Sequence, residues 1–265
     1  MIVQGSFVFK PKIMEISIKR TYIVLLISWL CLPAFPQAKR APEIASILQR
    51  YKGKWPSALT FVKTIRSQRY GEQTLKTEYH AYRFPDLARI DYGGPADGNA
   101  RLSKYDTVYN FSSFKGKRGY YMKDLYMSRY MLGNIYHGDL QQLQQALMKS
   151  NIDFNKTCTG RWQGREVFVY GTTAMEDNYH SQIWYDAKEL YPVRYIDRAG
   201  GNNSRDTHYK ISRIGNAWYP TSATEYINGK ITAEITFTAV SLGPEIDLRV
   251  FSVGDFGSVH WLQKN

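Results

Sequence analysis

The segment from Lys230 to Leu242 reads KITAEITFTAVSL, and its apolar and polar side chains alternate almost without interruption. One set of alternate positions is apolar: Ile231, Ala233, Ile235, Phe237 and Ala239. Successive side chains of a strand point to opposite faces, so a period of two predicts a strand with one face buried. This segment therefore predicts a long strand in an antiparallel sheet.

The same period recurs along most of the chain on the N-terminal side of this segment. Further strands are predicted over residues 58–69, 73–84, 87–92, 107–111, 119–123, 166–171, 180–186, 192–198, 205–214 and 218–227. Glycine-containing turns are predicted to separate several of them, as at Gly71-Glu72, residues 93–98 and Lys115-Gly116-Lys117. The chain thus contains about ten or eleven predicted strands.

Two segments have the period of a helix instead. The first is predicted near residues 44–51, between Pro42, which suits a first turn, and Gly53, which ends the helix. Its apolar positions recur at helical spacing: Ile44, Ile47, Leu48 and Tyr51. The second is predicted to begin after Asp139, a good N-cap residue. Its apolar stripe consists of Leu140, Leu143, Leu147 and Met148. Residues 125–135 are a further helix candidate.

Ten or eleven strands are more than a small β-sandwich contains, and two or three helices accompany them. We predict a mostly β (α+β) protein in which a large curved antiparallel sheet forms an incomplete barrel, its concave face covered by the helices. A sheet that does not close encloses apolar space, where small-molecule sites commonly lie. Ordinary core packing is the alternative explanation for strands that are apolar on both faces, such as residues 167–170.

The N-terminus has the order of a secretory signal peptide. Lys19-Arg20 precede the apolar run 22–32, and prolines and Ala38 follow. The run is too short for a typical membrane span. We therefore predict a signal peptide over residues 1–38, with translation beginning at Met14, and a single exported domain over residues 39–265. Lipid attachment at Cys31 is disfavoured because Leu30, which precedes it, is not small.

The chain is basic, with a formal net charge of +12. Residues 39–265 hold 31 basic and 22 acidic side chains, a net charge of +9. This excess favours contact with anionic lipid headgroups, although an ordinary solvated surface explains it equally well. No nucleic-acid-binding motif accompanies the short basic clusters, so we predict no nucleic-acid partner.

No catalytic, cofactor or metal motif is present in the sequence. The five histidines do not have metal-ligand spacing: His80, His137, His180, His208 and His260. The nearest carboxylate pairs, Asp86 with Asp91 and Glu176 with Asp177, are predicted at turns, where acidic residues are common. Cys158 is the single cysteine after the signal peptide and is expected to be a small buried apolar residue. We predict a protein that is not an enzyme and holds no cofactor or metal.

Three segments carry a resemblance to a known family. Residues 82–92 (YRFPDLARIDY) form a strand–proline–strand pattern, residues 105–111 (YDTVYNF) a tyrosine-rich strand, and residues 181–194 (SQIWYDAKELYPVR) a strand, an aspartate turn and a Pro-Val-Arg strand. Together they resemble the LolA/LolB-like lipoprotein carriers of the bacterial envelope. The likeness spans most of residues 40–255. This chain is longer and richer in tyrosine than the compact carriers.

The resemblance implies a periplasmic carrier of a Gram-negative-type envelope, whose apolar cavity binds the acyl chains of lipoproteins or other lipids and passes them towards the outer membrane. Such a protein is expected to be a monomer that transiently contacts anionic membrane surfaces and envelope transport partners. The candidate cavity-lining residues are Phe61, Ile65, Tyr79, Val167, Val169, Ile183, Ile235 and Phe237. The candidate lid residues are Leu140, Leu143 and Leu147. The alternative function is a non-catalytic envelope scaffold or interaction protein with a packed interior.

Overall fold

The structure is a computed structural model that describes residues 44–69, 72–105, 107–113, 115–121, 133, 136–177, 179–200 and 203–262. These residues belong to the unit Arg40–Asn265, which is distinct from the unit Met1–Lys39. The predicted signal peptide, with Met14 and Cys31, falls outside the described residues. So does nearly all of the helix candidate at residues 125–135.

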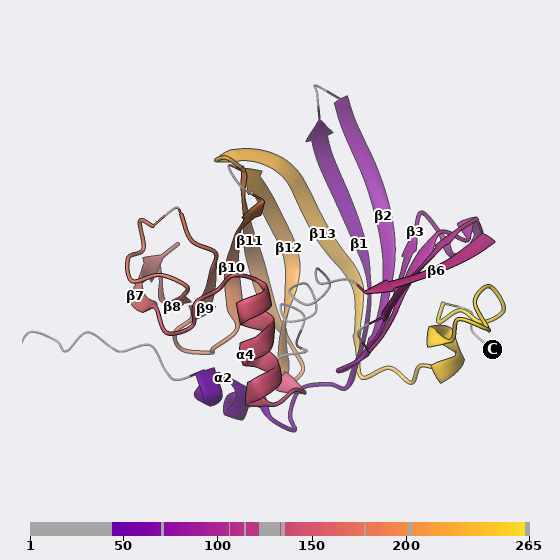
Figure 1. Ribbon diagram of the computed structural model, residues 1–265, viewed down its shortest axis with the longest axis horizontal. Helices are drawn as coiled ribbons and strands as arrows, with labels where there is room; N and C mark the ends of the chain where they lie inside the picture. The colour runs from indigo at the N-terminus through magenta and orange to yellow at the C-terminus, as the bar shows by residue number, and fades with distance from the viewer. Residues whose placement is uncertain are drawn as a thin grey trace, which may run out of the picture. The chain divides into compact units, whose positions relative to one another are not determined.

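Strands dominate the described part of the chain, where thirteen form one antiparallel sheet (Figure 1). The first six are β1 (Ala58–Arg69), β2 (Glu72–Arg83), β3 (Leu87–Tyr92), β4 (Ala100–Lys104), β5 (Thr107–Ser112) and β6 (Lys115–Tyr121). The others are β7 (Thr157–Trp162), β8 (Arg165–Tyr170), β9 (Gln182–Asp186), β10 (Pro192–Gly200), β11 (Asn203–Ile214), β12 (Ala217–Ile227) and β13 (Lys230–Leu242).

The order of the strands places the two ends of the domain at the centre of the sheet. Strands β1 to β6 run outward to one edge, β7 to β13 run inward from the other, and β1 pairs with β13. The sheet does not close, because β6 and β7 lie at opposite edges. The strands next to each other in sequence, β6 and β7, are thus the two edge strands, and the helix α4 (Leu140–Lys149) lies between them in the sequence.

Irregular pairing allows the long strands to bend. The register shifts in six of the twelve strand pairs, among them β1 with β13, β11 with β12 and β12 with β13. In β13, Ala239 has a φ of +50° at the position where the register with β1 shifts. Extra residues of this kind bend a strand and increase its twist, which is how a large sheet curves without closing.

Two α-helices are described, and both pack on the same face of the sheet. They are α2 (Ile44–Tyr51) and α4 (Leu140–Lys149), which contact each other and lie side by side in Figure 1. Helix α4 begins as predicted after Asp139, whose carboxylate accepts a hydrogen bond from the backbone N–H of Gln142 at 2.7 Å. The Gln142 side chain accepts in return from the N–H of Asp139 at 3.2 Å, a reciprocal cap.

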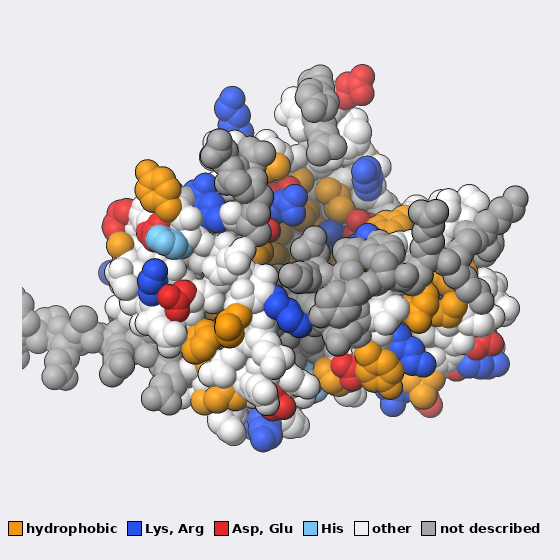
Figure 2. Space-filling model, in the orientation of Figure 1, with side chains coloured by type: hydrophobic (Ala, Val, Ile, Leu, Met, Phe, Trp, Pro, Cys, Tyr) orange, Lys and Arg blue, Asp and Glu red, His pale blue; other side chains and the backbone are white. Residues whose placement is uncertain are grey.

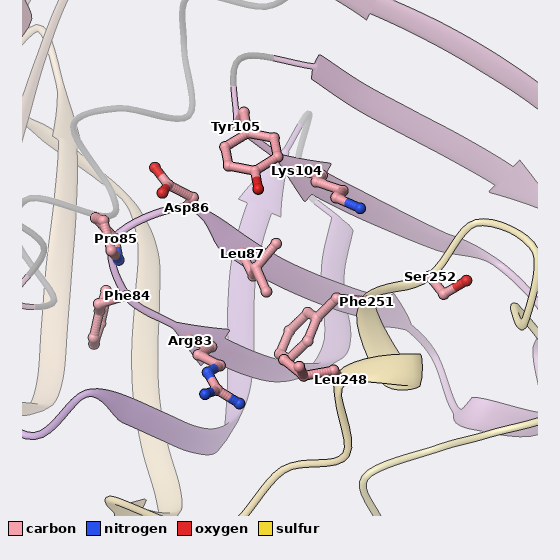
Figure 3. Close-up of a pocket in the computed structure, with 10 residues that line it drawn as sticks. All are labelled: Arg83, Phe84, Pro85, Asp86, Leu87, Lys104, Tyr105, Leu248, Phe251 and Ser252. Carbon is pink, nitrogen blue, oxygen red and sulfur yellow. The ribbon is translucent and has the colours of Figure 1, made fainter.

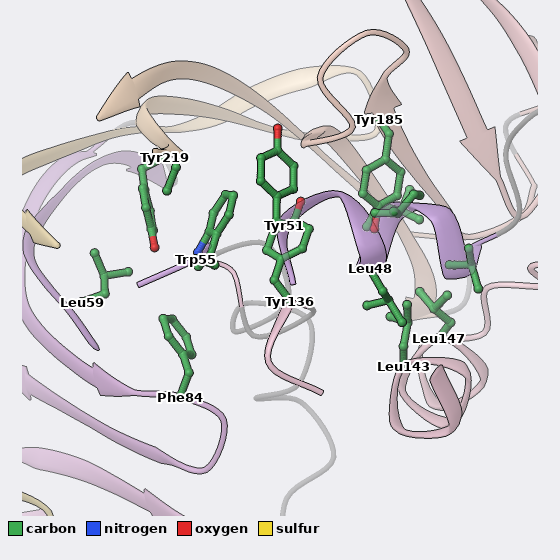
Figure 4. Close-up of a cluster of buried hydrophobic side chains, with 14 of the residues drawn as sticks. Leu48, Tyr51, Trp55, Leu59, Phe84, Tyr136, Leu143, Leu147, Tyr185 and Tyr219 are labelled. Atoms are coloured by element: carbon green, nitrogen blue, oxygen red, sulfur yellow. The ribbon is translucent and has the colours of Figure 1, made fainter. Parts of the chain in front are cut away.

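The main core lies between these helices and the sheet (Figure 4). Its centre is aromatic. The Trp55 ring lies 5.0 Å from Tyr51, 4.2 Å from Tyr136 and 5.3 Å from Tyr219, measured between ring centroids. The Tyr51 and Tyr136 hydroxyls donate to the backbone carbonyls of Glu189 and Leu190, which fixes this cluster to the turn between β9 and β10. We call the face of the sheet that bears this core the helix-covered face.

The opposite face is partly covered as well. The segment from residue 243 to residue 262, with the short 3-10 helix η3 (Leu248–Phe251), packs against Ala58 of β1 and Ala81 of β2. Further along, Val167, Val169, Trp184 and Val193 form a separate apolar cluster on this side. Strands β1, β2 and β8 to β10 are thus buried on both faces over part of their length.

Most predicted elements are confirmed, with three differences. Two short strands, β4 and β7, were not predicted, because β4 (ARLSK) has only two apolar residues and β7 (TCTGRW) contains a glycine and has no alternating apolar positions. The turn predicted at Lys115-Gly116-Lys117 is wrong, since β6 begins at Lys115. Asp91 was predicted at a turn but lies in β3 and is 1% exposed.

Candidate functional site

The helix-covered face extends beyond the core as an accessible wall. Along β1, Leu59 and Phe61 are almost fully buried, whereas Lys63 and Ile65 on the same face are half-buried. Because directly paired residues of neighbouring strands share a face, Phe237 of β13 joins Lys63 and Ile235 joins Ile65. The wall therefore keeps apolar residues at Ile65, Ile235 and Phe237 after it leaves the packed interior, with Lys63 among them.

Neighbouring strands continue this wall. Ala223 of β12 pairs with Ile235 and with Tyr209 of β11, and Tyr195 of β10 follows on the same face. Tyr209 is half-buried, and its burial raises the pKa of its phenol. Figure 2 shows a hollow on this side of the molecule, with hydrophobic side chains at its base and acidic and basic side chains around them. This wall above the core is the candidate binding site.

Five of the eight predicted lining residues share the helix-covered face. Phe61 and Ile183 are buried in its core, at 2% and 1% exposure. Ile65, Ile235 and Phe237 are half-buried in the wall beyond the core. The structure therefore brings three of the predicted residues together at the accessible part of the site.

The other three predicted lining residues face the opposite side of the sheet. Tyr79 pairs with Val62, one position out of phase with Phe61. Val167 and Val169 belong to the apolar cluster around Trp184. Strict alternation is the physical reason, because adjacent residues of one strand cannot share a face.

The three predicted lid residues differ in their exposure to solvent. Leu143 and Leu147 of α4 are 2% and 0% exposed and pack into the core beneath the helix. Leu140, in the first turn, is 37% exposed and lies outside that core. The buried pair attaches α4 to the helix-covered face, so any movement of α4 would have to separate this contact.

A polar network interrupts the apolar wall at β1 and β2. The Lys63 ammonium donates to the Glu78 carboxylate at 3.0 Å, and His80 Nε2 lies 2.9 Å from the same oxygen. His80 Nδ1 lies 3.0 Å from the Tyr82 hydroxyl, and the His80 ring stacks on Phe61 at 4.5 Å. A neutral His80 satisfies both contacts, donating from Nε2 to Glu78 and accepting at Nδ1 from Tyr82.

Burial and hydrogen bonding act in opposite directions within this network. Burial disfavours ionisation of Glu78, but the hydrogen bonds from His80 and Lys63 outweigh it and hold the pKa of this carboxyl at about 2. For His80, burial dominates and lowers the pKa despite the neighbouring carboxylate. At neutral pH the network is therefore a Lys63–Glu78 ion pair next to a neutral imidazole.

The sequence of β2 does indicate this network, but its apolar pattern favours the other face of the strand. Glu78, His80 and Tyr82 occupy alternate positions of one strand and so share a face. The residues of β2 in phase with Tyr79 and Ala81 are more apolar, so the apolar pattern predicts that they face the interior. Ala81 is indeed fully buried, but beneath the C-terminal segment on the opposite face.

Two kinds of feature are absent from the described residues. Within them, no group of three or more histidine, cysteine, aspartate or glutamate side chains is arranged to hold a metal ion. Nor does any helix in the described ranges have the length and apolar character needed to cross a membrane.

Solved structures show what this arrangement of sheet and helices is similar to. A LolA superfamily protein from Nitrosomonas europaea aligns with a TM-score of 0.53 and 12% identity, over 81% of this chain and 99% of its own. An outer membrane lipoprotein-sorting protein domain from Vibrio parahaemolyticus aligns with a TM-score of 0.58 and 13% identity, over 82% and 98%. The fold is LolA-like.

A third solved structure is also similar to this chain. A DUF1329 family protein from Desulfovibrio piger aligns with a TM-score of 0.55 and 13% identity, over 80% of this chain and 95% of its own. No family model matches the chain, and no curated protein matches it. The fold predicted from the resemblance is confirmed, and at these identities the likeness concerns the fold.

Proposed function

We propose that this protein is a non-catalytic carrier that binds the acyl chains of lipoproteins, or of other lipids, on the helix-covered face. The observation that carries the proposal is the half-buried apolar wall of Ile65, Ile235 and Phe237, which continues an otherwise packed core on a sheet that does not close. The LolA-like fold supports it, as does the likeness to a lipoprotein-sorting domain.

Burial of apolar surface provides the binding free energy. An acyl chain laid against the wall removes apolar surface from water on both partners, at roughly 25 cal/mol per Å². Even a partly inserted chain is then worth several kcal/mol. The Lys63–Glu78 ion pair beside the wall offers hydrogen-bonding groups to the polar part of the lipid, which an apolar wall alone would leave unpaired.

Delivery requires a partner with greater affinity for the cargo, because only differential affinity moves a ligand onward. The predicted signal peptide over residues 1–38 and the likeness to lipoprotein-sorting proteins support a periplasmic carrier in a Gram-negative-type envelope. We expect it to act towards the outer membrane, as a monomer. Its basic charge favours transient contact with anionic membrane surfaces on the way between envelope partners.

The test combines native mass spectrometry with charge substitution in the wall. The protein purified from its own envelope is expected to carry an acylated species that lipid extraction identifies. Ile235→Glu and Phe237→Glu are expected to abolish lipid uptake while the fold is kept, because the new carboxylate is half-exposed in the free protein and an acyl chain would have to bury it. Thr236→Glu is the matched control, since Thr236 is exposed and lies between them on the opposite face of β13.

The alternative is an envelope scaffold with a filled interior, and the aromatic cluster around Trp55 favours it, because it occupies the space between α2 and the sheet. This alternative predicts an apo mass and no uptake of added lipid or lipopeptide. It also predicts that Ile235→Glu affects stability alone. That combination of results would exclude the carrier function.

A further inference from the structure

A cavity lies on the opposite face of the sheet, away from the proposed acyl site. It has a volume of about 310 Å³, at the small end of the range for ligand pockets. It opens where the β2–β3 turn, the end of β4 and η3 meet (Figure 3). Its lining residues are Arg83, Phe84, Pro85, Asp86, Leu87, Lys104, Tyr105, Leu248, Phe251 and Ser252.

The strand register explains the arrangement of charge in this cavity. Arg83 of β2 pairs directly with Leu87 of β3, which pairs directly with Lys104 of β4. Side chains in such a row share a face, and neighbouring Cβ atoms are about 5 Å apart. The sheet therefore presents two cationic residues with Cβ atoms about 10 Å apart, one on each side of an apolar leucine.

The two cations have no partner within the described residues, where neither Arg83 nor Lys104 makes an ion pair. One carboxylate, Asp86, also lines the cavity, so the cationic charge exceeds the anionic charge there. Figure 3 shows the Asp86 carboxylate directed away from Leu87 and Phe251. Arg83 and Lys104 are both exposed, and Figure 3 shows their charged ends on different sides of Leu87 and Phe251. Two cationic side chains at the rim of one cavity favour an anion in it.

The rest of the cavity is apolar. Phe251 is 3% exposed and belongs to the apolar cluster over β1 and β2, with Leu87 packed against it. At the rim, Leu248 is 54% exposed and Tyr105 is 65% exposed. Exposed leucine and tyrosine next to lysine and arginine is a composition suited to the boundary between water and lipid.

We propose that this cavity binds an anionic amphiphile, with the phosphate or carboxylate between Arg83 and Lys104 and the apolar part against Leu87, Leu248 and Phe251. Two sources share this chemistry: a phospholipid headgroup in a membrane and a free small amphiphile. The site is independent of the proposed acyl site, which lies on the other face of the sheet.

The test measures binding of dihexanoyl phosphatidylglycerol, below its micelle concentration, by titration calorimetry. Dihexanoyl phosphatidylcholine lacks the net charge and glycerol 3-phosphate lacks the apolar part, so both are expected to bind far more weakly. Sedimentation with vesicles of phosphatidylcholine, with and without phosphatidylglycerol, distinguishes the sources. Pocket-dependent vesicle binding identifies a membrane headgroup, and binding of the soluble amphiphile alone identifies a free molecule.

Matched variants make the test specific to the cavity. Arg83→Gln with Lys104→Gln is expected to weaken binding roughly tenfold to a hundredfold, as for loss of hydrogen bonds to charged groups. Lys210→Gln with Lys230→Gln removes the same charge from exposed positions on β11 and β13 and is expected to bind normally. Leu248→Asp tests the apolar rim independently.

Two results would overturn the proposal. One is an equal loss of binding in both double variants, which would assign the interaction to net charge. The other is no binding of phosphatidylglycerol in either form by the unaltered protein. Ile235→Glu is expected to leave binding at this cavity unchanged, so failure of the acyl-carrier function and failure of this site are distinguishable.

Discussion

At the scale of single residues, Glu78 carries the most informative electrostatics of the site. Its carboxylate is largely buried, and hydrogen bonds from Lys63 and His80 stabilise it there. The pKa of Glu78 is about 2, below its ordinary value of 4.5. A carboxyl with a depressed folded-state pKa stabilises the fold fully above its unfolded pKa, and the stabilisation is lost as pH falls through the folded pKa.

We predict that Glu78→Gln lowers the free energy of unfolding by roughly 2–4 kcal/mol at neutral pH, since each unit of pKa shift corresponds to about 1.4 kcal/mol. The difference between the two proteins should shrink as pH falls from about 4.5 towards 2. Urea unfolding across this pH range measures it. Glu72→Gln, at the exposed end of the same strand, is the control and should change little. A loss that stays constant with pH would show that the carboxylate charge is not responsible.

At the scale of elements, the C-terminal segment is attached by a buried ionic network. The Arg89 guanidinium makes hydrogen bonds of 2.9 to 3.1 Å to Asp91, and its Nη1 donates to the Val259 carbonyl at 2.9 Å. His260 Nε2 lies 2.9 Å from the Asp91 carboxylate. The Arg89 and Asp91 side chains are each 2% exposed, so neither is solvated if its partner is lost.

We predict that Asp91→Asn lowers the free energy of unfolding by about 3–5 kcal/mol, because it leaves the Arg89 charge buried without a counter-ion. The C-terminal segment should detach before the sheet unfolds, so limited proteolysis should cut within residues 243–262. Asp247→Asn, which breaks the exposed pair with Arg249 in the same segment, is the control and should leave the cleavage pattern unchanged. If residues 243–262 resist proteolysis equally well in the Asp91→Asn variant, Asp91 does not attach this segment to the sheet.

Some features of the helices and strands follow from the local sequence, and others do not. The helix from Ile44 to Tyr51 and the cap at Asp139 follow from local spacing and are confirmed, because capping and helical period involve residues a few positions apart. The same reasoning placed Asp91 at a turn, although it is a buried partner of Arg89 and His260. No local pattern connects Asp91 to a histidine 169 positions away.

At the scale of the whole domain, stability should be greatest where the two halves of the chain meet. Strands β1 and β13 are central, long and paired on both sides, whereas β6 and β7 have one neighbour each in the described sheet. The first and last strands of the domain thus hold the two halves together.

We predict that backbone amides of β1, β2 and β13 exchange hydrogen most slowly, and that protection decreases towards β7, because edge strands open without disturbing the centre. Hydrogen–deuterium exchange followed by mass spectrometry measures this gradient. Bound lipid should slow exchange further along the wall of β1, β12 and β13. Equal protection of β7 and β13 would indicate that the sheet opens as a single unit.

The sequence by itself determined the period of most elements, the helix caps and hence a large antiparallel sheet with a few helices, because these depend on residues close together in the chain. The tertiary structure decided which side of each strand became the site. A period of two marks two faces equally, as the positions of Tyr79 and Glu78 on β2 show. Which face receives α4 and which receives the C-terminal segment depends on a crossing between sheet edges and on contacts such as Arg89 with Val259, 170 residues apart. Those contacts form only when the whole domain has folded, so no local pattern specifies them.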